Sequence, residues 1–174
     1  QILDVVNLVS VLRNANEAEI NGIELDLTYS PSLEGLKLHA NFALMDSEFK
    51  DALVNGVSLS GNALKLAPEK TAAVSLAYDV VLNTGTLTFF GAYNWQDEQF
   101  WDIQNTVIQG SYGLWSGQIR YKDRSEKWQI ALTAKNLSDR EYSNAIINYG
   151  TGLGDEFVKG LPRMVNLEFR YAFN

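Results

Sequence analysis

The chain has 174 residues, the size of one ordinary domain, and carries 14 Lys and Arg against 21 Asp and Glu. Its net charge of -7 argues against nucleic acid as a partner, because binding to phosphates needs clustered cations. The absence of Cys and the single His exclude disulfides, thiolate catalysis and Cys- or His-based metal centres.

Apolar and polar residues alternate with a period of two along most of the chain, which is the pattern of half-buried β-strands. The alternation predicts seven strands, over residues 9–30, 35–49, 68–82, 85–100, 112–122, 127–138 and 162–173. Residues 1–3 are expected to be the end of an eighth strand. No run of 18 apolar residues predicts a transmembrane helix. Because residue 1 is Gln and no signal peptide is visible near it, we expect the natural N-terminus to lie elsewhere.

The links between the predicted strands alternate in length. Short turns are expected near residues 31–35, 83–85 and 122–126, and long polar loops near residues 50–67, 101–111 and 138–161. Short turns at one end of the strands and long loops at the other are typical of an outer-membrane β-barrel. The sequence therefore predicts an all-β fold, an antiparallel transmembrane β-barrel segment.

A half-buried sheet in a soluble β-sandwich would show the same alternation. The placement of the aromatic residues favours the membrane, because they gather towards both ends of the apolar faces, as in the two interfacial girdles of a barrel. Near the short turns lie Tyr29, Tyr78, Tyr121, Trp128 and Tyr171, and near the long loops lie Phe49, Trp95, Phe100 and Trp101.

Four segments together resemble the C-terminal barrel region of TonB-dependent outer-membrane receptors. They are NANEAEINGIELDL at 14–27, APEKTAAVSLAY at 67–78, KNLSDREY at 135–142 and VNLEFRYAF at 165–173. The resemblance implies that residues 1–174 are the C-terminal portion of a 22-stranded barrel whose plug domain and N-terminal strands are absent here. It also implies a bacterial outer-membrane location and energy-coupled import of scarce ligands, above all iron–siderophore complexes, through the TonB complex.

Roles for individual residues follow from the resemblance and from the strand phase. Inward polar residues are expected to hydrate the lumen and contact the plug: Glu24, Asp26, His39, Glu168 and Arg170. The final strand is expected to supply the barrel-assembly signal with its apolar side: Val165, Leu167, Phe169, Tyr171 and Phe173. The family usually ends on that last aromatic residue, whereas Asn174 follows it here.

Ligand contacts are expected from aromatic residues of the long loops, Trp101, Tyr112, Tyr142 and Tyr149, for which packing within the loops is the alternative. No cofactor and no metal site is expected, because the carboxylate clusters lack the spacing of a calcium loop. No enzyme activity is expected either, since the GxSxG motif of a nucleophile elbow is absent. A small closed outer-membrane barrel with a structural or adhesion role remains the alternative to an importer.

Overall fold

The computed structural model describes residues 2–6, 9–13, 17–54, 56–149 and 154–173, and every regular element within them is a β-strand. The long strands are β3 (Glu17–Tyr29), β4 (Leu36–Asp51), β7 (Lys70–Leu82), β8 (Gly85–Gln96), β11 (Tyr112–Asp123), β12 (Trp128–Lys135) and β15 (Met164–Tyr171). The short strands are β1 (Ile2–Val6), β2 (Val9–Arg13), β5 (Leu53–Val54), β6 (Val57–Ser58), β9 (Gln99–Phe100), β10 (Ile108–Gln109), β13 (Ser143–Asn148) and β14 (Asp155–Lys159). None of the described residues belongs to a helix long and apolar enough to cross a membrane.

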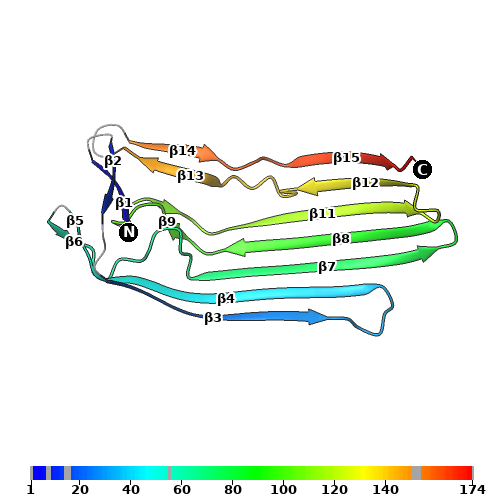
Figure 1. Ribbon diagram of the computed structural model, residues 1–174, viewed down its shortest axis with the longest axis horizontal. Coiled ribbons are helices and arrows are strands. Elements are labelled where there is room, and N and C mark those ends of the chain that lie inside the picture. Colours follow the sequence, from blue (N-terminus) through cyan, green and yellow to red (C-terminus); the bar gives the residue numbers. More distant parts are fainter. Residues whose placement is uncertain (1, 7–8, 14–16, 55, 150–153, 174) are drawn as a thin grey trace.

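The long strands form one seven-stranded antiparallel sheet in the order β15-β12-β11-β8-β7-β4-β3, so every strand pairs with its neighbour in this series. Figure 1 shows the tight turns at one end of the sheet and the short hairpins at the other. We call these the turn end and the loop end. The predicted alternation of short turns and long loops is thus confirmed.

Two tight turns show why the turn end is compact. Gly35 has a φ of 83°, and a Cβ there would collide with the carbonyl oxygen of Asp79, so only glycine fits between these two hairpins. In the turn after β11, the Asp123 carboxylate accepts hydrogen bonds from the Ser125 hydroxyl at 2.6 Å and from the Trp128 amide at 3.0 Å. These bonds satisfy backbone and side-chain donors where the chain reverses.

Strand register sorts the side chains onto two faces. Leu132 pairs with Ile119 and with Leu167, and Leu44 pairs with Ile23, so apolar side chains share one face across the sheet. Thr133 pairs with Gln118 and with Asn166, which puts polar side chains on the other face. We call these the apolar face and the polar face. The apolar face is exposed, with Leu167 at 67% and Ile23 at 71%.

Three sequence predictions about strands are wrong. Residues 9–13, predicted to share one strand with residues 17–30, form β2 instead, which pairs with β1 in a separate two-stranded sheet, while residues 14–16 lie outside the described part. Residues 2–3 therefore belong to a separate hairpin and not to an eighth strand of the main sheet, while Gln1 is not described. The strand predicted over 85–100 ends at Gln96, because Gln99–Phe100 pairs with β10 instead.

The main sheet is open in the described chain, since its two outermost strands, β3 and β15, each have one partner. A small closed barrel would need these two strands to pair with each other. The structure thus argues against the closed-barrel alternative, and the sheet is a segment of wall with two free edges.

Candidate ligand-facing site

The predicted inward residues all lie on the polar face, because each one alternates with apolar neighbours in the register. They form two groups at opposite edges of the sheet. On β3 and β4, His39 Nε2 lies 3.6 Å from an Asp26 carboxylate oxygen, and its Nδ1 lies 3.3 Å from the Thr28 hydroxyl. On β15, Arg170 pairs with Glu168 at 3.2 Å. Glu24 faces Ala43 across the β3–β4 ladder. The five residues therefore do not form a single site.

The structure brings together two of the four predicted loop aromatics. Tyr112 at the start of β11 and Tyr142 just before β13 stack with ring centroids 4.8 Å apart and an interplanar angle of 20°. Tyr149 lies farther along the same loop, where its hydroxyl donates to Glu156 at 2.7 Å. That bond raises the pKa of Tyr149. Trp101 belongs to the loop between β8 and β11, and its indole N–H is buried without a partner among the described residues.

Asn136, in the KNLSDREY segment, anchors the base of the loop between β12 and β15. Its side chain is buried, donates to the carbonyls of Arg140 at 2.9 Å and Leu161 at 3.0 Å, and accepts from the Arg140 amide at 2.8 Å. Its φ of 49° suits asparagine, which tolerates the left-handed region better than most residues. Both ends of the loop are thus tied to one side chain directly above the polar face.

Two other long loops pack into one unit at the loop end. The Ala63 amide donates to the Asn105 side-chain oxygen at 2.8 Å, and the Asn105 side-chain nitrogen donates back to the Ala63 carbonyl at 3.0 Å. The Asn62 side chain donates to the Ile103 carbonyl at 2.9 Å. Beneath these bonds lies a small apolar core of Phe49, Ala52, Val54, Leu59 and Ile103. The loops after β4 and after β8 therefore support each other.

Phe49 does not belong to the aromatic girdle predicted near the long loops. Its side chain is only 4% exposed and belongs to this loop core, so it cannot sit at a lipid interface. The apolar face instead carries Tyr93 and Trp115 near the loop end, with ring centroids 4.4 Å apart. Tyr93 and Trp115 alternate with polar neighbours, and this pattern in the sequence already predicts their place on the apolar face.

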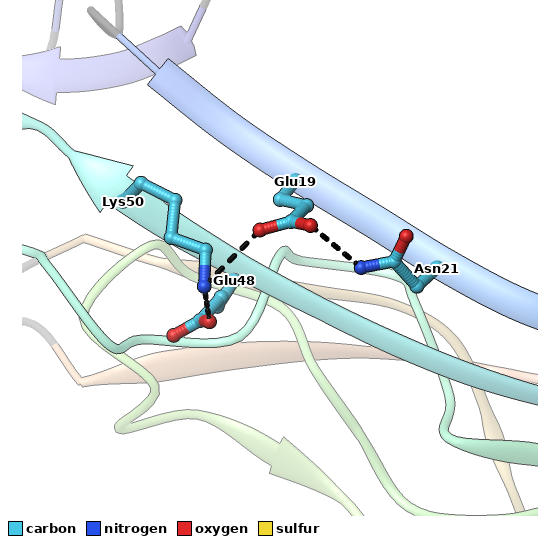
Figure 2. A network of polar contacts seen from close by, with 4 residues as sticks. All are labelled: Glu19, Asn21, Glu48 and Lys50. Carbon is cyan, nitrogen blue, oxygen red and sulfur yellow. Dashed lines mark hydrogen bonds and ion pairs between the residues drawn. The ribbon is translucent and has the colours of Figure 1, made fainter.

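A network of charges ties the outer ends of β3 and β4 together (Figure 2). The Lys50 ammonium donates to the Glu48 carboxylate and lies 3.1 Å from one carboxylate oxygen of Glu19. The other carboxylate oxygen of Glu19 accepts a hydrogen bond from the Asn21 side chain at 2.8 Å. The Asn21 amide and the Lys50 ammonium hold the pKa of Glu19 below its usual value, and the two carboxylates raise the pKa of Lys50. This exposed network joins the two strand ends.

The polar face also has a hollow of about 270 Å³ near the loop end. Its polar side chains come from four consecutive strands and are Asn41, Thr71, Asn94, Gln96 and Tyr112. We call it the amide hollow. Alternation in the sequence predicts Asn41 and Asn94 as separate inward positions and Tyr112 as a loop aromatic, and it does not predict that they lie together. Only the register places Gln96 opposite both Thr71 and Tyr112. In the described part of the chain, no group of His, Asp and Glu side chains could hold a metal ion.

Comparison with known proteins identifies the family. The family model described as TonB dependent receptor-like, beta-barrel matches residues 1–137, so the chain belongs to the family of TonB-dependent receptors. Members of this family are outer-membrane receptors and transporters of Gram-negative bacteria, not enzymes. No curated protein sequence matches the chain.

Solved structures share the fold. The ferric yersiniabactin uptake receptor FyuA of Yersinia pestis matches 90% of this chain and 24% of its own length, with a TM-score of 0.79 and 23% identity. The ferric preacinetobactin receptor BauA of Acinetobacter baumannii matches 98% of this chain and 25% of its own, with a TM-score of 0.71 and 24% identity. The siderophore receptor PiuA of the same species matches 88% and 22%, with a TM-score of 0.71 and 21% identity. The chain thus spans about a quarter of the length of these receptors.

Proposed function

We propose that this chain forms the C-terminal wall and extracellular loops of a TonB-dependent importer of iron–siderophore complexes in the outer membrane. The single observation that carries the proposal is the open seven-stranded sheet with one exposed apolar face and one polar face. A lipid-facing side and an aqueous side are what the wall of a large barrel requires.

The partners proposed with this function are the remainder of the same receptor, outer-membrane lipid and the TonB complex. The missing strands would pair with the free edges of β3 and β15, because unpaired N–H and C=O groups are costly in a bilayer. The plug would lie against the polar face, where Glu24, Asp26, His39, Glu168 and Arg170 would contact it or the lumen water. Two of the similar structures are receptors for ferric siderophores, FyuA for ferric yersiniabactin and BauA for ferric preacinetobactin, and PiuA is a siderophore receptor, which supports the choice of ligand class.

The proposal is tested by deleting the gene that encodes the full-length receptor and measuring growth on a panel of iron–siderophore complexes under iron limitation. We expect growth on at least one complex to fail in the deletion strain and to return with the intact gene but not in a strain without TonB. If the deletion strain grows normally on every iron complex but fails on a particular carbon source, the receptor imports that carbon source and not an iron complex.

The loop between β12 and β15 supplies a second test. Removing residues 144–155 is expected to weaken uptake while the barrel still assembles, because Asn136 and the strands below the loop are untouched. Unchanged ligand affinity in this deletion would remove the loop, and with it Tyr149, from the proposed site.

A further inference from the structure

The amide hollow has a lining suited to an uncharged partner. Its polar groups are three carboxamides, a threonine hydroxyl and a phenol, and none of the described residues that line it is an Asp, Glu, Lys, Arg or His. Carboxamides offer both donors and acceptors, so they recognise carbonyl and hydroxyl oxygens without a charge. A site for a polyanion would be expected to present guanidinium or ammonium groups instead.

One of these carboxamides has a hydrogen-bond donor without a partner. The Gln96 side-chain nitrogen is buried and has no hydrogen-bond partner among the described residues. A buried donor left unpaired is costly, and nearly all such groups in proteins find a partner. Gln96 lines the hollow, so a rotation of its side chain would bring this buried donor to a ligand oxygen placed there.

The hollow continues into a second one with an aromatic wall. Asn94 and Leu114 line both spaces, and the second, of about 220 Å³, reaches Tyr142, the partner of Tyr112 in the stacked pair. Together they give a surface of carboxamides beside two tyrosine rings, and Lys135 is the one charged residue that lines the second hollow. Such a mixture of apolar contact and a few oriented polar groups is typical of small-molecule sites.

The charged residues around the loop end also favour a ligand without negative charge. Residues 17–24, 43–54, 56–71, 96–113, 135–149 and 154–164, which surround that end, contain fourteen Asp and Glu against seven Lys and Arg. Three of the seven cations, Lys50, Lys70 and Lys159, already pair with carboxylates. The field at the mouth of this wall therefore repels anionic ligands and slows their approach.

We propose that the amide hollow binds an uncharged, oxygen-rich part of the ligand, and that the chelate recognised is of the neutral or cationic hydroxamate class, not the polyanionic catecholate or citrate class. This inference rests on the proposed function and adds to it the chemistry of the cargo.

The test measures binding to the purified full-length receptor with two probes: ferrichrome, an uncharged ferric tris-hydroxamate, and ferric enterobactin, a polyanionic tris-catecholate. We expect ferrichrome to bind at least about tenfold more tightly, because it avoids the repulsion of the loop end. Gln96→Leu and Asn94→Leu should each weaken ferrichrome binding by about 3- to 10-fold, the effect of one lost hydrogen bond.

The matched control is Gln118→Leu, which removes a carboxamide from the same polar face outside the hollow, where it donates to the Thr133 hydroxyl at 2.9 Å. Ferrichrome affinity should be unchanged in this variant. Wild-type affinity in both Gln96→Leu and Asn94→Leu, or equal or tighter binding of ferric enterobactin, would overturn the inference while iron import still stands. Binding of no iron chelate at all would overturn the proposed function as well.

Discussion

Two glycines leave room for tyrosine rings on opposite faces of the sheet. A Cβ on Gly160 would fall within the Tyr142 ring, and a Cβ on Gly113 would fall within the Tyr93 ring. Neither glycine is needed for an unusual backbone angle, since neither has a positive φ. They are required for space, and through them Tyr142 can stack on Tyr112 while Tyr93 reaches Trp115.

Gly160→Ala is therefore expected to displace the Tyr142 ring and break the stack with Tyr112, a loss of about 0.5–1.5 kcal/mol. The loop that holds β13 and β14 should then open more often. Limited proteolysis of the folded full-length receptor should show up to about tenfold faster cleavage between residues 143 and 159.

Gly110→Ala serves as the control, because a Cβ at Gly110 would meet no atom within 4 Å. Its cleavage rate should match that of the unmodified receptor. Equal rates in Gly160→Ala and Gly110→Ala would show that the position of the Tyr142 ring does not restrain this loop.

Each strand of the sheet carries opposite chemistry on its two sides, and β15 shows the contrast over adjacent residues. Leu167 lies on the apolar face, paired with Leu132, and Asn166 lies on the polar face, paired with Thr133. A shift of one residue in register would exchange these faces completely. A charged substitution is therefore expected to have opposite effects on barrel assembly at these two neighbouring positions.

Leu167→Arg in the full-length receptor is expected to cost about 2–4 kcal/mol, because it places a charge on the lipid-facing side near mid-strand. Asn166→Arg should cost little, since its side chain would point to the aqueous side. Folded barrel in outer-membrane fractions, measured by heat-modifiable migration, should drop only for Leu167→Arg. Equal yields, or a larger defect for Asn166→Arg, would contradict the assigned faces.

The outer ends of β3 and β4 are joined by charged side chains, next to the loop core that Phe49 of β4 enters. The pKa of Glu19 is lowered in the folded chain, so its contribution to stability is present above the ordinary glutamate pKa and is lost as pH falls through the lowered value. The pKa of Lys50 is raised, so its contribution is present below the ordinary lysine pKa and is lost as pH rises through the raised value.

We accordingly expect hydrogen exchange at these strand ends to be slowest between the two ordinary pKa values and to increase in acid, beyond the intrinsic pH dependence of exchange. Glu19→Gln should remove much of the acid-induced change, and added salt should weaken the protection because the network is exposed. The Asn41 region of β4, far from these charges, provides an internal reference. A pH response in Glu19→Gln equal to that of the original sequence would rule out this network as its cause.

As a whole, the described part of the chain is an open sheet whose two faces are not covered by a second layer of strands or helices. The apolar face of the sheet is exposed, and the buried apolar residues include the loop core around Leu59. The edges of β3 and β15 leave backbone groups available for pairing with further strands. Under the proposed function, lipid and the remainder of the barrel would supply the missing stability at this scale.

The isolated chain in detergent is expected to aggregate, and to become monodisperse only when refolded with the N-terminal portion of the receptor. Size-exclusion chromatography with light scattering distinguishes these states. A monodisperse, heat-stable monomer of residues 1–174 alone would revive the small closed barrel.

The alternation of apolar and polar residues was sufficient to predict the long strands and the face on which each of their side chains lies. The bounds of β4, β7 and β11 follow the predicted segments closely, because alternation is a property of consecutive residues and the sheet preserves it. The pairing of β3 with β4, of β7 with β8 and of β11 with β12 also follows from the short turns that join them.

Contacts between distant residues could not be read in this way. Asn105 meets Ala63 across 42 positions, Phe49 enters a loop core, and β2 pairs with β1 although the alternation runs on past it. The amide hollow likewise exists because register aligns side chains from β4, β7, β8 and β11. A period of two tells which way a side chain points, but its neighbours are set by loop paths and strand offsets, which depend on the packing of the complete chain.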